Sequence, residues 1–223
     1  MQHSQDFKVI EMSEKHHGKE RAYRLNPAEL DEYKRSGFIT AYGQPMQVGD
    51  EPPIFTFGFV KPHAYNKKDK IMADIQEMSE ERGSLLYPAY EKTYQFTREE
   101  IEAHYAVHRD KPFFEDLVRM SIEGPVYKFI LTGRDAIVEF RKLLGATHPK
   151  DRAPDTLRYK YGESDPKRIA YNAIHGSDSL ESFLAEVDLH FTEQEHIELG
   201  EQFWKRLELY RHHLETGAKG SCA

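Results

Sequence analysis

Residues 54–60, Ile-Phe-Thr-Phe-Gly-Phe-Val, give the strongest structural signal in the chain. A mostly apolar run of this length, without polar alternation, is typical of a strand that is buried on both faces of a sheet. Strand and helix signals then follow one another along the chain. We therefore expect a sheet covered by helices, with one of its inner strands at 54–60.

The segments that follow predict a helix over 67–82 that Gly83 ends, and a strand from Leu85 to Phe96. Thr97 and Glu100 form a capping box, which opens another helix. We also expect strands at 126–131 and 187–191, a short apolar step at 173–174, and helices at 135–144 and 179–186. This order indicates an α+β fold of the ferredoxin-like, split βαβ kind, in which helices cover an antiparallel sheet.

The two ends of the chain have a different character from this middle part. We divide the chain into an N-terminal extension over 1–53, a domain over 54–197 and a C-terminal helical extension over 198–223. In the first segment Asn26-Pro27 predicts a short helix at 28–35, and the Gly- and Pro-rich residues 41–53 mark the boundary. In the last, a capping box at Thr192 and an apolar stripe from Ile197 to Leu214 predict one long helix. We expect this helix to pack on its own domain or on a neighbouring subunit.

Composition excludes several classes of protein. The 223 residues carry a net charge of −7 and a single cysteine, Cys222. We therefore expect no disulfide framework, no cysteine zinc site, no general nucleic-acid binding and no membrane partner. The N-terminus lacks the layout of a signal peptide, so we expect a cytoplasmic protein. P-loop, Rossmann, HExxH and GxSxG motifs are all absent from the sequence.

The most informative segment is 172–178, Asn-Ala-Ile-His-Gly-Ser-Asp. Here His175 ends an apolar step, and turn and helix-cap residues follow it at once. This layout places an imidazole at the end of one element and beside the N-terminus of the next. A single histidine is more often structural than catalytic, but these surroundings favour a functional role.

This segment matches at every fixed position the signature N-x-x-H-[GA]-S-D of the nucleoside diphosphate kinase family, which the chain resembles. The resemblance extends over roughly residues 54–195, with motifs in family order. They are Lys61-Pro62, His104-Tyr105, DKPFF at 110–114, EGPV at 123–126, the Arg141 to Thr147 segment and PDTLR at 154–158.

The resemblance implies that the terminal phosphoryl group moves between nucleoside triphosphates and diphosphates through a phosphohistidine at His175. A neutral imidazole is a good nucleophile near pH 7, and two half-reactions let one site serve both nucleotides. Glu186 matches the glutamate that holds the far nitrogen of the histidine, and Ser177 matches the neighbouring hydroxyl.

The nucleotide-binding residues that the resemblance implies differ in what they would contact. Cations and hydroxyls would hold the phosphates, an aromatic ring and an apolar side chain would flank the base, and an amide would contact the ribose. In that order they are Lys61, Arg141, Arg158, Tyr105, Thr147, Phe113, Ile169 and Asn172. Mg²⁺ would arrive on the nucleotide phosphates without a protein ligand. We also expect a homo-oligomer, because the family commonly forms one.

The chain departs from the family pattern at three places. His63 stands where the family has an aspartate after the lysine and proline, and His148 stands where it has an asparagine. The stretch from Arg158 to His175 is also longer than usual. Two alternatives stay open: a non-enzymatic nucleotide-binding or scaffolding member, and an enzyme that passes its phosphoryl group to protein histidine or to water.

Overall fold

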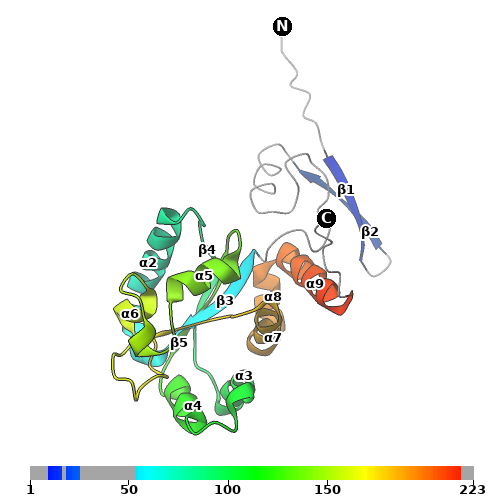
Figure 1. Cartoon of the computed structure of the whole chain (residues 1–223). Coiled ribbons are helices and arrows are strands. Elements are labelled where there is room, and N and C mark those ends of the chain that lie inside the picture. Colours follow the sequence, from blue (N-terminus) through cyan, green and yellow to red (C-terminus); the bar gives the residue numbers. More distant parts are fainter. Residues whose placement is uncertain (1–9, 17–18, 26–53, 217–223) are drawn as a thin grey trace. The chain divides into compact units, whose positions relative to one another are not determined.

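A computed structural model describes residues 10–16, 19–25 and 54–216 (Figure 1). The chain divides into two compact units, residues 1–50 and 51–223. In the first unit β1 (Ile10–His16) and β2 (Lys19–Leu25) form an antiparallel hairpin, which the sequence did not predict. The expected helix at 28–35 and the expected boundary at 41–53 lie outside the described residues.

The second unit is built on a four-stranded antiparallel sheet. Its strands are β3 (Phe55–Val60), β4 (Tyr87–Tyr94), β5 (Val126–Thr132) and β6 (Ile174–Gly176), in the order β4-β5-β3-β6. The predicted first strand therefore lies inside the sheet, and all six of its residues are buried. This arrangement confirms the ferredoxin-like α+β expectation.

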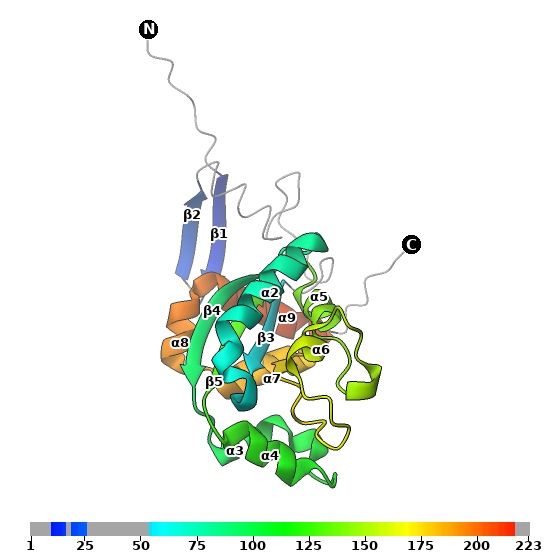
Figure 2. The ribbon, with the colours of Figure 1, turned by 90° about the vertical axis from the view of Figure 1, so that its left-hand side faces the viewer.

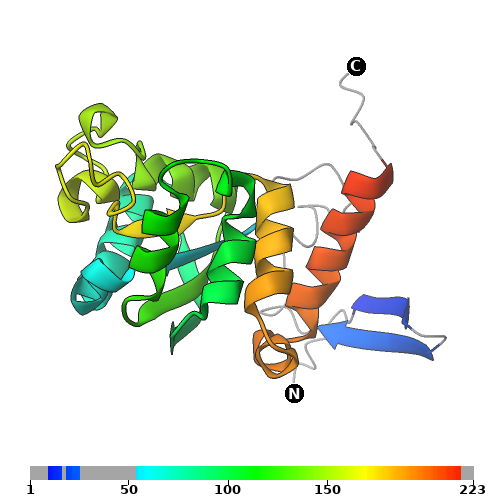
Figure 3. The same cartoon turned by 90° about the horizontal axis from the view of Figure 1, so that it is seen from below.

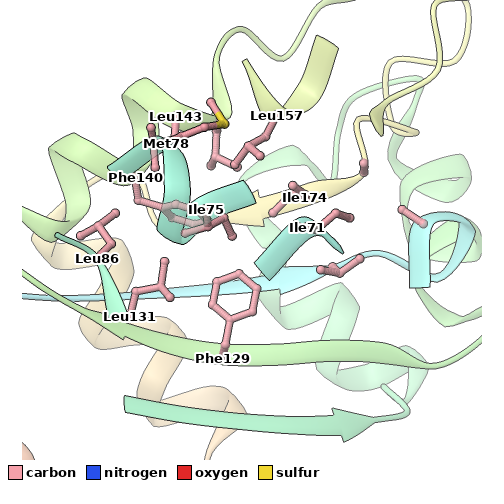
Figure 4. Close-up of a cluster of buried hydrophobic side chains, with 14 of the residues drawn as sticks. Ile71, Ile75, Met78, Leu86, Phe129, Leu131, Phe140, Leu143, Leu157 and Ile174 are labelled. Atoms are coloured by element: carbon pink, nitrogen blue, oxygen red, sulfur yellow. The ribbon is translucent and has the colours of Figure 1, made fainter. Parts of the chain in front are cut away.

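One face of the sheet is covered by α2 (Lys68–Glu81), α5 (Ala136–Leu144) and the short α6 (Leu157–Tyr161). Figure 4 shows apolar side chains of these helices meeting those of β5 and β6 in one cluster. Gly58 of β3 lies within this layer, where a Cβ atom would come 2.6 Å from the Phe129 ring and 2.8 Å from the carbonyl oxygen of His175. Only glycine allows β3, β5 and β6 to pack this closely.

The other face carries α3 (Arg98–His104), α4 (Phe114–Ile122) and α7 (Leu180–His190), which Figure 2 shows in part. The rings of Phe57 and Phe59 on β3 are fully buried in this second layer. The capping box at Thr97 is present at the start of α3. Short 3-10 helices at Pro62–Lys67, Ala106–His108 and Pro149–Asp151 connect the main elements.

Two predictions about the C-terminal third are wrong. The expected strand at 187–191 is instead the end of α7, because Val187 and His190 continue the buried face that Phe183 begins. The expected single long helix is broken into α8 (Glu193–Leu199) and α9 (Glu201–Thr216). Gly200 between them adopts a φ of 82°, which favours glycine, and Ile197 of the predicted stripe is 68% exposed.

A buried ion pair joins this region to the sheet. Lys128 of β5 is fully buried, and its Nζ lies 2.8 Å from Glu195 Oε1 and donates to the carbonyl oxygen of His190 at 2.8 Å. Tyr90 Oη donates to the same carboxylate. Burial acts to raise the pKa of Glu195, but the hydrogen bonds from Lys128 and Tyr90 help to outweigh it, and that pKa is lowered below its ordinary value. The end of α7 and the start of α8 are thus held at a fixed place on the sheet.

Helix α9 packs beside α7, and Figure 3 shows the two in red and gold. The Phe203 ring meets the Phe55 ring edge to face at 4.9 Å, and Tyr210 Oη accepts a hydrogen bond from the backbone N–H of Ile54 at 2.8 Å. The helix therefore covers the beginning of β3. In the described part of the chain, no helix combines the length and apolar character needed to span a bilayer.

Candidate active site

His175 is the middle residue of β6 and lies opposite Phe59 in the ladder with β3. Its ring stacks on the Phe59 ring, with centroids 4.8 Å apart. The backbone on either side is tightly constrained. Ala173 has a left-handed φ of 67°, and a Cβ atom at Gly176 would meet the Phe140 ring at 2.6 Å. The fold thus fixes the position of the imidazole before any ligand arrives.

One side of the His175 ring is bound to a carboxylate. Its Nε2 lies 2.9 Å from Glu186 Oε1, and Ser177 Oγ donates to Glu186 Oε2 at 2.5 Å. Glu186 comes from the middle of α7, so a helix on one face of the sheet meets a residue of an edge strand. No hydrogen bond within the described residues engages Nδ1 of His175.

The surroundings set the protonation of this pair. Burial lowers the pKa of His175 well below its ordinary value, and the charges of Lys61, Arg158 and Arg141 lower it further. Burial raises the pKa of Glu186 to about 7, while His104 and the Ser177 hydrogen bond oppose that rise. His175 is therefore neutral at pH 7. With its hydrogen on Nε2 and donated to Glu186, the ring keeps a lone pair on Nδ1.

Two buried cations lie beside this histidine. Lys61 follows β3 directly, is 3% exposed and donates through Nζ to the carbonyl oxygen of Ala170 at 2.9 Å. Arg158 is equally buried and donates to the carbonyl oxygen of Ile174 and, at 3.1 Å, to Thr147 Oγ1. Burial and neighbouring arginines lower the pKa of Lys61 to about 7 and that of Arg158 to about 9. Buried, mutually repelling cations are stabilised when an anion binds among them.

Arg152 is a third buried cation that the sequence analysis missed. Its guanidinium donates to the carbonyl oxygens of Thr147, Arg158 and Glu163 at 2.7–3.2 Å. These bonds tie together the loops on both sides of α6. Arg152 falls between two of the quoted motifs, so no motif pointed to it.

Two buried polar atoms near the site have no hydrogen-bond partner among the residues that the structure describes. The Tyr105 hydroxyl lies near Ser121, but Ser121 Oγ donates to the carbonyl oxygen of Leu117, and Tyr105 Oη has no hydrogen bond within the described residues. Asn172 Oδ1 is likewise buried and unpartnered there. Buried polar groups are normally hydrogen-bonded, so both atoms are suited to a bound ligand.

His63, where the chain departs from the family pattern, is half-buried against the Tyr171 ring at 5.0 Å. Burial and the nearby Lys61 charge lower the pKa of His63 to about 4. It is therefore neutral at pH 7 and adds no charge to the site. Tyr171 belongs to the lengthened stretch between Arg158 and His175. There the Arg168 guanidinium lies 3.7 Å from the Tyr171 ring centroid and pairs with Glu163.

Comparisons with known proteins bear on the family and the fold. The family model described as nucleoside diphosphate kinase matches residues 55–196, which is more than half of the chain. The chain belongs to the nucleoside diphosphate kinase family. Curated nucleoside diphosphate kinases of Campylobacter concisus and Legionella pneumophila are each 39% identical to it over 140 residues. Each match covers 63% of this chain, and it covers 96% and 94% of those two relatives.

Solved structures of the family share the fold. The Aquifex aeolicus nucleoside diphosphate kinase is 32% identical, with a TM-score of 0.54 over 64% of this chain and 97% of that one. The Halobacterium salinarum nucleoside diphosphate kinase, solved in complex with CDP, is 36% identical, with a TM-score of 0.54 over 63% of this chain and 89% of that one. The family and its fold are thereby established for this chain, and the roles of individual site residues stay predictions.

Some of the predicted site residues contact one another in the structure, and others have no described contact with His175. His175, Glu186 and Ser177 are connected by hydrogen bonds, as are Arg158 and Thr147. Arg141 reaches the site through a 3.4 Å hydrogen bond from Nη1 to the carbonyl oxygen of Gly176. The Tyr105 and His175 ring centroids are 6.4 Å apart. No described contact links His175 to the side chains of Asn172, Phe113 or Ile169; the last two are 48% and 40% exposed.

Two further histidines of the site were not assigned a role from the sequence. The His104 ring lies 4.5 Å from the His175 ring between centroids, and His190 Nε2 lies 2.9 Å from His104 Nδ1. His104 could have been suspected from its place beside Tyr105 in a family motif. His190 was hidden by the wrong strand prediction, because a helix is needed to place it one turn after Glu186.

Proposed function

We propose that this chain transfers the terminal phosphoryl group of a nucleoside triphosphate to a nucleoside diphosphate through a phosphohistidine at His175. The observation that carries the proposal is the bond between His175 Nε2 and Glu186, which leaves the lone pair of Nδ1 available on a neutral ring. A nucleophile of this kind needs no further base.

In the first half-reaction Nδ1 attacks the γ-phosphorus, and the bond from that phosphorus to the bridging oxygen breaks. The diphosphate leaves with the bonding electron pair. In the second, a terminal oxygen of another diphosphate attacks the phosphohistidine, the P–N bond breaks and Nδ1 regains its lone pair. Glu186 accepts the Nε2 hydrogen throughout and stabilises the positive charge that develops on the ring.

Charge on the transferring group would be balanced by Lys61, Arg141 and Arg158. Phosphoryl transfer passes through a loose transition state, so its catalysis rests mainly on position and electrostatics. Tyr105 Oη and Thr147 Oγ1 would donate to phosphate oxygens, and Asn172 Oδ1 would accept from a ribose hydroxyl. Exposed Phe113 and Ile169 would flank the base, an arrangement that any base tolerates.

Mg²⁺ is the metal that this reaction implies. The charged groups aimed at the proposed phosphate positions are cationic, which suits phosphate oxygens and not a metal ion. We therefore propose that Mg²⁺ enters bound to the nucleotide phosphates, keeps several waters and takes no ligand from the protein. It would supply charge neutralisation at the phosphates.

Radiolabel transfer tests the proposal. Incubation with γ-labelled ATP and Mg²⁺ should give an acid-labile, alkali-stable phosphoprotein, and the label should move to added GDP. His175→Ala should abolish both steps. His196→Ala removes a histidine that packs on Trp204, away from the site, and should keep both.

Each other outcome supports a different alternative. Labelling without transfer to GDP would favour transfer to a protein histidine, and rapid release of phosphate would favour hydrolysis. A folded wild-type protein that takes up no label would favour the non-enzymatic, nucleotide-binding member.

We further propose that the chain forms a homo-oligomer in the cytoplasm. The homo-oligomer is supported by the family resemblance, and the cytoplasm by the single cysteine, which fits a reducing compartment. Light scattering on the purified full chain would test the assembly, and a single-chain mass would contradict it.

A further inference from the structure

A second and a third imidazole lie behind the proposed nucleophile. His104 is the last residue of α3, and one of its ring nitrogens lies within 4.8 Å of both a His175 nitrogen and a Glu186 oxygen. His190, four residues after Glu186 on α7, is 3% exposed, and its Nε2 lies 2.9 Å from His104 Nδ1. The described contacts of His190 do not include the proposed nucleotide-binding residues.

Both of these rings are neutral. Burial lowers the pKa of His190 to about 3, with smaller contributions from His175 and Lys128. Burial also lowers the pKa of His104 well below its ordinary value; His175, His190 and Lys61 act in the same direction, and Glu186 acts against them. Two neutral imidazoles joined by one hydrogen bond have two possible arrangements, since either ring can be the donor.

The surroundings of His190 decide between the two. Its other nitrogen, Nδ1, is buried and has no hydrogen-bond partner within the described residues. The ring stacks on Phe57 at 5.4 Å and packs on Phe96 at 4.8 Å between centroids. If His104 were the donor, the hydrogen of His190 would sit on Nδ1 with no acceptor. If His190 is the donor, Nδ1 holds only a lone pair.

The surroundings of His104 favour the same arrangement. When its Nδ1 accepts from His190, its own hydrogen must be on Nε2. The His104 ring, which has a nitrogen within 4.8 Å of a Glu186 oxygen, then carries its hydrogen on the nitrogen that does not face His190. A lone pair beside that carboxylate would be repelled, whereas an N–H is attracted.

We propose that His190 is a positioning residue for the phosphotransfer site, which donates from Nε2 to His104 Nδ1 and thereby fixes His104 as the Nε2–H tautomer. The inference rests on the proposed function of His175. It has two consequences: Glu186 is held as a hydrogen-bond acceptor for His175, and Nε2 of His104 carries a hydrogen and so has no lone pair with which to compete for the phosphoryl group.

Nitrogen NMR of the full-length wild-type protein tests the tautomer directly. In long-range ¹⁵N–¹H spectra of ¹⁵N-histidine-labelled protein, the His104 signals are identified by their loss in His104→Gln. We expect a protonated Nε2 and a bare Nδ1 at pH 7. A protonated Nδ1 on His104 would overturn the proposal. This measurement needs no phosphotransfer, so its failure is distinct from a failure of the proposed function.

Kinetics of three variants test the consequence for catalysis. His190→Phe keeps an aromatic ring but removes the donor, and we expect kcat to fall about tenfold with KM for ATP and GDP within about twofold. His190→Gln keeps an N–H donor and should restore most of that loss. Leu184→Ala removes buried packing from α7 and leaves both histidines in place, so it should lower Tm and leave kcat within about twofold.

A folded His190→Phe protein with wild-type kcat would refute the positioning role. So would an equal loss of kcat in His190→Phe, His190→Gln and Leu184→Ala, because packing alone would then explain the effect. If His190→Phe does not fold, the tautomer found in the wild-type protein still decides.

Discussion

Replacing Glu186 by glutamine should make the protein more stable and less active at the same time. Glu186 has its pKa raised from 4.5 to about 7, chiefly by burial. The unfolded chain releases this proton near pH 4.5, whereas the folded protein holds it to about pH 7. Between these values the folded state binds more protons, so this group makes stability fall as pH rises through that window.

The size of the effect follows from the same pKa values. One pKa unit corresponds to about 1.4 kcal/mol, so a shift from 4.5 to about 7 means that the ionised carboxylate destabilises the fold by about 3 kcal/mol at pH 8. Glutamine has the same shape without the charge. We expect Glu186→Gln to raise Tm by roughly 6–12 °C at pH 8 and to leave it nearly unchanged at pH 4. Its kcat should fall by about 10- to 100-fold, because a hydrogen bond to a charged group is lost.

Thermal unfolding at pH 4, 6 and 8 measures the stability, and transfer of phosphate from ATP to GDP measures kcat. Glu181→Gln is the matched control, because it removes an exposed carboxylate from the same helix. Its Tm should change by no more than about 2 °C at each pH. A Glu186→Gln protein with the same Tm difference at pH 4 and pH 8, or with a lower Tm at pH 8, would refute the electrostatic argument.

Three shorter predictions follow from the packing and the hydrogen bonds. Ser177→Ala removes the donor to Glu186 Oε2 and should lower kcat about tenfold while KM stays within about twofold; an unchanged kcat in steady-state assays would contradict it. Gly58→Ala forces a Cβ into the Phe129 ring and should lower the free energy of unfolding by at least about 2 kcal/mol in urea titrations, and wild-type stability would count against it. Lys128→Met leaves the buried Glu195 carboxylate without its main partner and should lower the free energy of unfolding by about 3–5 kcal/mol at pH 7. The loss should be much smaller near pH 3. A loss of equal size at both pH values would show that only packing matters.

The sequence was sufficient for the fold, and it named His175, Glu186 and Ser177, which the structure joins by hydrogen bonds. Their roles stay predictions. The buried run at 54–60 and the capping boxes predict elements that the structure contains, because both signals are local. The end of α7 was misread. Val187 and Phe191 resemble a strand when considered alone, and only the tertiary position of Phe183 and His190 shows that the helix continues.

What the sequence could not supply was the set of partners of each side chain. Arg158 was expected to face phosphate oxygens, yet it also binds the backbone of Ile174 and Gly145 and so helps to build the site. Arg152 acts on backbone carbonyls alone among its described hydrogen bonds. Contacts from arginine to carbonyl oxygens leave no trace in sequence spacing, since any residue provides a carbonyl group.

Two contacts of α9 show that the folding unit extends beyond the region of family similarity. They are the hydrogen bond from Ile54 to Tyr210 and the ring contact between Phe55 and Phe203. Similarity to the family stops at residue 196, but the amide just before β3 and the first ring of β3 are covered by residues beyond that limit. A protein shortened to the region of similarity would expose an aromatic surface and an unsatisfied N–H at the start of its central strand. Evolutionary boundary and physical boundary therefore differ here, and the terminal helix belongs to the enzyme's own architecture.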